Sequence, residues 1–159
     1  MEDIYVTETD YTHTGNVITA TEKRYFKDTQ GNKRDGNTSL TTYTYTFENE
    51  NLIKKTENST EYNSTTEYTY DGKNNPLFQN FKKLMDPDYF NDAKNSKNNI
   101  LTRKITTKYN YNNSTIVKEY VYEHTYADNN YPLTEKVFDK TTENGVEKKE
   151  LDETTEYAY

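Results

Sequence analysis

Two histidines are the first candidates for acid–base or metal chemistry, because the chain contains no cysteine. Neither His13 nor His124 has cysteine, histidine or clustered carboxylate neighbours at the spacing of a metal site. Both lie among aromatic residues in segments that alternate as strands do. We therefore expect both histidines to be structural, and the sequence predicts neither a metal site nor thiol chemistry.

Asp86, Asp88, Asn91 and Asp92 carry the side-chain oxygens that calcium prefers. An EF-hand loop, however, has glycine at its sixth position and an acidic residue at its twelfth, where this chain has Asn91 and Lys97. A solvated loop explains this run better than a calcium site does.

Motifs for nucleophilic catalysis and phosphate binding are also missing. No serine lies in a Gly-x-Ser-x-Gly turn, and the five glycines are too scattered to form a phosphate-binding loop. Paired carboxylates, as in glycosidases, stay open as an alternative because 27 acidic residues must form some pairs, although surface charge explains them more simply. We expect no catalytic residue and no cofactor, and hence a protein that is not an enzyme.

The 17 tyrosines are the most distinctive potential binding residues. Tyrosine combines a flat apolar ring with a polar tip, which suits stacking on sugars or packing against a protein partner. The simpler interpretation, which we favour, is that tyrosine forms the core of a sheet with few other apolar side chains. Five tyrosines share one predicted strand face and form the candidate ligand site: Tyr109, Tyr111, Tyr120, Tyr122 and Tyr126.

Charge and hydropathy bear on which classes of partner the protein can bind. The net charge of −7 disfavours binding to the phosphate backbone of a nucleic acid. No apolar run approaches the roughly 18 residues of a membrane-spanning helix. The first residues are acidic and alternate, unlike a secretory signal peptide, so we expect none in this chain. A glycan or protein partner is therefore expected, with no nucleic acid and no membrane span.

Most of the chain has the pattern of antiparallel strands with one buried face, because threonine, asparagine and tyrosine alternate at period two. A turn at Gly15-Asn16 pairs Tyr5 with Phe26 on one face, and the other face sets Glu8 opposite Lys23.

Two later hairpins follow from the same pattern. For residues 100–127, a connection at residues 112–115 would set Lys104 opposite Glu123 on the solvated face. In the last hairpin, a turn at Asn144-Gly145 pairs Phe138 with Leu151 but also opposes Lys140 to Lys149, so we expect a bulge or a longer loop there. The register of the last hairpin is left open.

Internal repetition supports a set of drifted hairpins. A Tyr-x-aromatic pair before a turn occurs at Tyr45 and again at Tyr109. A longer motif, which begins Thr69-Tyr70-Asp71, recurs in similar form from Thr125.

One insertion, at about residues 77–99, interrupts the strands. Leu77, Phe81 and Leu84 have helical spacing, and Asn75 is a suitable N-cap, which predicts a short helix near residues 77–85. The polar stretch at residues 91–99 lacks strand signals, so we expect it to be an exposed loop.

These observations predict a single all-β domain over residues 1–159. We expect about eight or nine long antiparallel strands in a meander, strongly twisted and curled into an open or nearly closed barrel.

The motif Tyr68-x-Tyr70-Asp71-Gly72, the insertion after it and the strand that begins near Ile100 resemble a family of uncharacterised Bacteroidetes surface or periplasmic lipoproteins. The resemblance covers roughly residues 40–159, and the Tyr-x-Tyr-Asp element is also similar to YD-repeat proteins. The resemblance implies a porin-like open antiparallel sheet, an exported protein and no known catalytic residues. The chain lacks the signal peptide and the lipobox cysteine of that family.

Two functions of different kinds follow from these features. The first is a non-enzymatic exported or cell-surface module with a structural or adhesive role. The second is a protein that binds a small ligand or glycan on its tyrosine-lined face. The two differ in whether the tyrosines leave a cavity.

Overall fold

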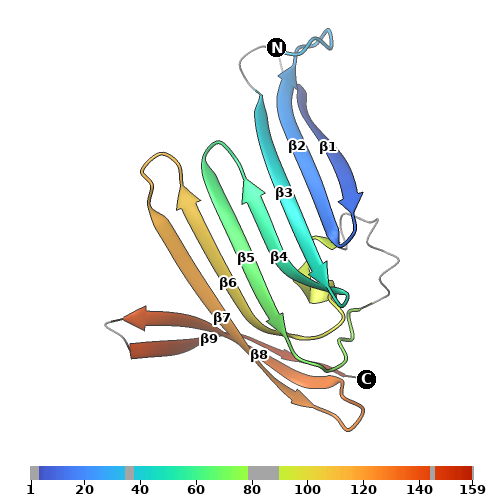
Figure 1. Cartoon of the computed structure of the whole chain (residues 1–159), viewed down its shortest axis with the longest axis vertical. Coiled ribbons are helices and arrows are strands. Elements are labelled where there is room, and N and C mark those ends of the chain that lie inside the picture. The colour runs from blue at the N-terminus through green and yellow to red at the C-terminus, as the bar shows by residue number, and fades with distance from the viewer. Residues whose placement is uncertain (1–3, 35–37, 79–89, 144–145, 159) are drawn as a thin grey trace.

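The computed structural model describes residues 4–34, 38–78, 90–143 and 146–158. They form one sheet of nine antiparallel strands, each paired with the next along the chain (Figure 1), which confirms the predicted all-β meander. β1 and β9 are the two edges, so the sheet is open. The strands are β1 (Ile4–Thr14), β2 (Val17–Lys27), β3 (Ser39–Glu48), β4 (Asn51–Asn58), β5 (Tyr62–Tyr70), β6 (Ile100–Tyr109), β7 (Thr115–Tyr126), β8 (Pro132–Glu143) and β9 (Val146–Glu156).

The first hairpin has the predicted register. Tyr5 lies opposite Phe26, and Glu8 lies opposite Lys23. Gly15 adopts a φ of 57°, the left-handed conformation that glycine reaches without steric cost in a two-residue turn.

The predicted register of the β6–β7 hairpin is wrong, although its faces are right. Lys104 lies opposite Glu119 rather than Glu123, and their side chains form an ion pair of 3.4 Å. The turn starts earlier than expected, since the Tyr109 N–H donates to the Ser114 carbonyl at 2.9 Å. Because the shift is an even number of residues, every side chain keeps its face.

The last hairpin contains the like-charge contact that the sequence indicated. Phe138 lies opposite Leu151 as predicted, and Lys140 lies opposite Lys149. A bulge interrupts the register between Val137 and Phe138. The predicted turn residues 144–145 lie outside the described residues.

Carboxylates on neighbouring strands compensate for the opposed lysines. The Lys140 ammonium lies 2.5 Å from Glu147 and 3.5 Å from Glu119. The Lys149 ammonium lies 3.3 Å from Glu123. Opposite charges on β9 and on the flanking strand β7 therefore offset the repulsion within the hairpin.

The sheet has one aromatic face, which carries Ile18 on β2, Tyr45 on β3 and Tyr122 on β7 in a shared core. The opposite face is rich in threonine, lysine and glutamate. Figure 1 shows the β8–β9 pair turned strongly relative to β1–β7, which is the twist that long antiparallel strands accumulate.

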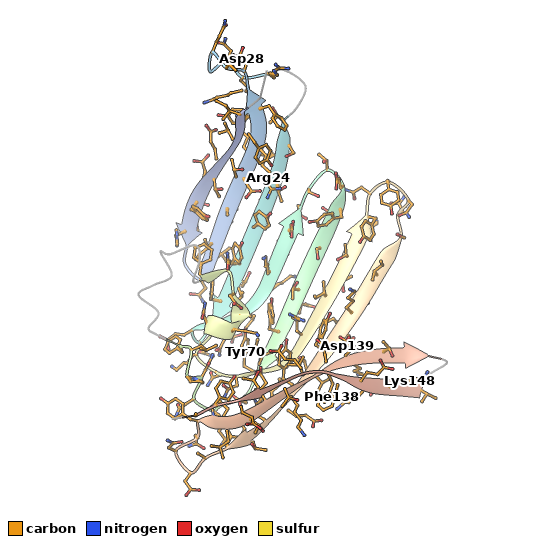
Figure 2. The ribbon with its side chains drawn as sticks, turned by 180° about the vertical axis from the view of Figure 1, so that it is seen from behind. Arg24, Asp28, Tyr70, Phe138, Asp139 and Lys148 are labelled. Atoms are coloured by element: carbon orange, nitrogen blue, oxygen red, sulfur yellow. The ribbon has the colours of Figure 1, made fainter. Side chains whose placement is uncertain are left out.

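Residues 90–99 cover one end of the aromatic face (Figure 2), in front of β3 and β4. The Phe90 ring packs edge-on against Tyr45, with centroids 5.1 Å apart. The expectation of an exposed loop at residues 91–99 is therefore wrong in part, because Ala93, Ser96 and Asn99 are buried. A local pattern does not reveal this burial, since the partners of these residues lie on distant strands.

The predicted helix at residues 77–85 falls largely outside the described residues. Its expected N-cap forms an Asx turn, in which Asn75 Oδ1 accepts from the Leu77 N–H at 3.0 Å. Within the described ranges, the insertion contains a 3-10 turn at Ala93–Asn95. No helix of the described residues is long and apolar enough to span a membrane.

Candidate functional site

The five tyrosines of the predicted ligand site do not stay together. Tyr122 is 5% exposed and belongs to the core. Tyr120 is half-buried, with the Arg103 guanidinium 4.0 Å from its ring centre. The Tyr126 hydroxyl donates to the Asp71 carboxylate. Three of the five therefore have structural contacts, and Tyr109 and Tyr111 remain as candidates for a ligand.

Asp71 joins the two copies of the longer repeat. Its carboxylate accepts from the backbone N–H groups of Lys73 and Asn99 at 3.0 and 3.1 Å, and from the Tyr126 hydroxyl of the second copy. The Lys73 ammonium in turn donates to Asn130 Oδ1 at 2.6 Å. The repeat that the sequence showed thus marks a structural junction, which we call the Asp71 cluster.

A second set of polar contacts fixes residues 90–99 to the sheet. Ser96 Oγ accepts from the Leu52 N–H at 3.0 Å and donates to the Tyr70 hydroxyl at 3.0 Å. The Tyr70 hydroxyl donates to the Leu52 carbonyl at 2.6 Å. Buried polar groups are tolerated here because each one has a hydrogen-bond partner.

The two histidines occupy different environments. His13 is exposed on β1, whereas the His124 side chain is 1% exposed. His124 Nε2 lies 2.9 Å from the Ile100 carbonyl, and Nδ1 lies 3.8 Å from the Glu135 carboxylate. Among the described residues, no group of three or more histidine, aspartate or glutamate side chains is arranged to hold a metal ion.

The environment of Glu135 should make the free energy of unfolding depend on pH. Burial raises its pKa, although the nearby His124 and Lys94 act in the opposite direction. As the pH falls, the Glu135 carboxylate is therefore protonated in the folded protein at a higher pH than in the unfolded chain. We expect Glu135→Gln to raise the free energy of unfolding near neutral pH, and this advantage should vanish as the pH falls towards the ordinary glutamate pKa of 4.5.

Urea denaturation of both proteins between pH 4.5 and 8 measures this difference. A gap that stays constant across the range would contradict a buried carboxylate at Glu135, because a mere packing change does not depend on pH.

Three rings, the half-buried Tyr62 and Tyr109 and the exposed Tyr111, lie at the opposite end of the aromatic face from Phe90, and we call them the tyrosine cluster. The ring centres of Tyr62 and Tyr109 are 6.3 Å apart, and those of Tyr109 and Tyr111 are 5.7 Å apart. Tyr111 is 79% exposed. The three rings line an open hollow of about 530 Å³ together with Thr60, Glu61 and Asn110.

Sequence reasoning missed Tyr62. Its signal is the β5–β6 register, which sets Tyr62 directly opposite Tyr109. That pairing joins residues far apart in the chain, so neither hairpin on its own predicts it.

Hydrogen bonds hold the tyrosine cluster in place. The Tyr62 hydroxyl donates to the Glu57 carboxylate at 2.6 Å. This hydrogen bond is the main reason that the pKa of Tyr62 is raised to about 12. The Asn110 side-chain amide donates to the Ser59 and Thr60 carbonyls at 3.3 and 3.1 Å. The two neighbouring turns are thus tied together, and the hollow is preorganised.

No protein-family model, curated protein or solved structure matches this chain. The resemblance to the Bacteroidetes lipoprotein domain gains no support from these comparisons and stays a prediction. The geometry of the site is therefore the basis for a function.

Proposed function

We propose that this protein is a non-enzymatic β-sheet module, exported to the periplasm or cell surface, that adheres to glycans through the tyrosine cluster. The observation that carries the proposal is the exposed hollow beside Tyr62, Tyr109 and Tyr111. Export rests on the family resemblance alone.

The chemistry of the hollow suits carbohydrate. Each tyrosine ring offers a flat apolar surface to the apolar face of a sugar, and its hydroxyl offers a polar edge. The carboxylate of Glu61 and the hydroxyl of Thr60, which line the same hollow, can accept hydrogen bonds from sugar hydroxyls. An open hollow of this kind fits a chain of sugars better than an enclosed small molecule.

A purely structural module is the second candidate. The packing of Tyr120 and Tyr122 favours it, because both tyrosines belong to or pack against the core. In that case the rings of the tyrosine cluster would be a consequence of composition and would bind no ligand.

Tyr111→Ala tests the glycan proposal. The chain has no tryptophan, so titration can be followed by tyrosine fluorescence, with cellohexaose, xylohexaose, maltohexaose and tetragalacturonate as probes. We expect at least one probe to bind and Tyr111→Ala to weaken it about three- to tenfold, since an aromatic contact contributes roughly 0.5 to 1.5 kcal/mol beyond its area.

Tyr5→Ala is the matched control, because Tyr5 is 54% exposed on the same face at a distant edge strand. It should leave the affinity unchanged. If no probe binds at millimolar concentration, or if both variants weaken binding equally, the glycan proposal is wrong and the structural role stands.

A further inference from the structure

Two cations on the aromatic face have no acidic partner among the residues that the structure describes. Arg103 on β6 and Lys55 on β4 form no ion pair in the described part of the chain. The Nε atom of Arg103 is buried and has no hydrogen-bond partner there. A half-buried guanidinium without a carboxylate is unusual, because removing it from water is costly unless the charge is compensated.

Strand pairing brings the two cations to one place. Lys55 lies opposite Thr66 on β5, and the next residue of β5 on that face, Tyr68, lies opposite Arg103. The cations therefore flank β5 from its two sides, about 12 Å apart at the backbone, since two strand spacings and a two-residue offset separate them. Between them is a hollow of about 140 Å³, whose lining also includes the Ser64 and Thr66 hydroxyls.

Aromatic rings hold both cations in position. The Arg103 guanidinium lies 4.0 Å from the centre of the Tyr120 ring. The Lys55 ammonium lies 5.5 Å from the ring centre of Tyr45 and 5.7 Å from that of Tyr43. Cation–π contacts of this kind orient a charge but do not neutralise it. The hollow is thus a small, preorganised positive site.

The one carboxylate in this hollow has another partner. Glu57 accepts from the Tyr62 hydroxyl at 2.6 Å and makes no ion pair with Lys55 or Arg103. With two cations and one carboxylate, the lining of the hollow carries a net positive charge. A small oxyanion would bind here, since a guanidinium presents a fork of N–H donors that matches a carboxylate or sulfate.

This positive site and the tyrosine cluster lie on the same face of the same strand. From Tyr62 to Tyr68, β5 rises by about 20 Å. Between them, the hydroxyls of Ser64 and Thr107 are 3.1 Å apart and form a polar floor. Figure 2 shows that residues 90–99 cover β3 and β4 at one end and leave the other end of β5 and β6 uncovered.

We propose that the hollow between Lys55 and Arg103 binds the acid group, carboxylate or sulfate, of an acidic glycan whose sugar rings stack on the tyrosine cluster. This inference rests on the proposed function and names its ligand class. The net charge of −7 repels long, densely charged polyanions, so the matching ligand is short or has widely spaced acid groups.

Calorimetry of the whole chain with tetragalacturonate and with its methyl ester tests the proposal. We expect the acid to bind at least tenfold more tightly than the neutral ester, and Arg103→Gln and Lys55→Gln each to remove most of that difference. Lys108→Gln is the matched control, because it removes one positive charge from the opposite face of β6. It should leave the preference intact.

A carrageenan tetrasaccharide, which carries sulfate groups and no carboxylate, distinguishes the two oxyanions, and tighter binding of it than of the uronate assigns the site to sulfate. Equal affinity for acid and ester overturns the inference while the proposed function stands. If no sugar binds, the proposed function fails, and acetate and sulfate titrations of the Arg103 Nε–H signal by NMR still decide whether the anion site exists. A saturable shift that Lys55→Gln weakens supports it, and no shift overturns it.

Discussion

Asp71→Ala should lower the free energy of unfolding by about 3 kcal/mol, because hydrogen bonds to a charged acceptor contribute roughly 1.5 to 3 kcal/mol and several are lost together. The carboxylate accepts from two backbone N–H groups, from the Asn99 side-chain amide at 3.2 Å and from the Tyr126 hydroxyl. Its removal leaves these part-buried donors without their acceptor. Urea denaturation followed by circular dichroism measures the loss.

Asp28→Ala is the matched control for Asp71. Asp28 also accepts from two backbone N–H groups, those of Gln30 and Asn32, each at 2.9 Å. Its partners are all within one exposed turn, where water can replace the carboxylate. A loss for Asp28→Ala as large as that for Asp71→Ala would mean that the junction between the two repeats contributes nothing beyond a local turn.

Phe90→Ala should destabilise the protein by about 3 to 5 kcal/mol, the range for removing a buried phenylalanine. Phe90 is 3% exposed and packs edge-on against Tyr11 and Tyr45. Without it, residues 90–99 lose their main apolar anchor and the core tyrosines gain access to water. The midpoint of urea denaturation should fall, and near-ultraviolet circular dichroism should weaken.

Phe26→Ala provides the comparison for Phe90. Phe26 lies on the same aromatic face and its ring is 5.2 Å from that of Tyr5, but it is half-buried at the uncovered end. We expect its loss to cost about 1 kcal/mol, since less apolar area leaves the interior. Equal effects of the two variants would contradict a core confined to the covered end.

The sequence was sufficient to predict the faces of the sheet but not every register. A two-residue turn at Gly15-Asn16 defines the first hairpin, and its register is confirmed. Between β6 and β7 the chain offers several asparagines that can start a turn, and the turn closes around Ser114 earlier than expected. Side-chain alternation specifies the face of each residue, whereas the turn specifies its partner.

The candidate site was predictable only in part. Tyr109 and Tyr111 were visible as alternating aromatics, but Tyr62 joins them through a pairing between distant segments. The burial of Ser96 and Asn99 was missed because polar residues are normally exposed, and their partners Leu52 and Asp71 are remote in sequence.

The simple meander order has a consequence for how the chain folds. Each strand pairs only with its neighbour in sequence, so most pairings close short loops and the sheet can grow one hairpin at a time. Contacts between segments that are not neighbours in the sheet occur at one end, where residues 90–99 contact β4 and the Asp71 cluster joins the ends of β5 and β7. During synthesis, the strands can therefore pair in the order in which they leave the ribosome. The sheet reaches its full stability only when the contacts at this end form.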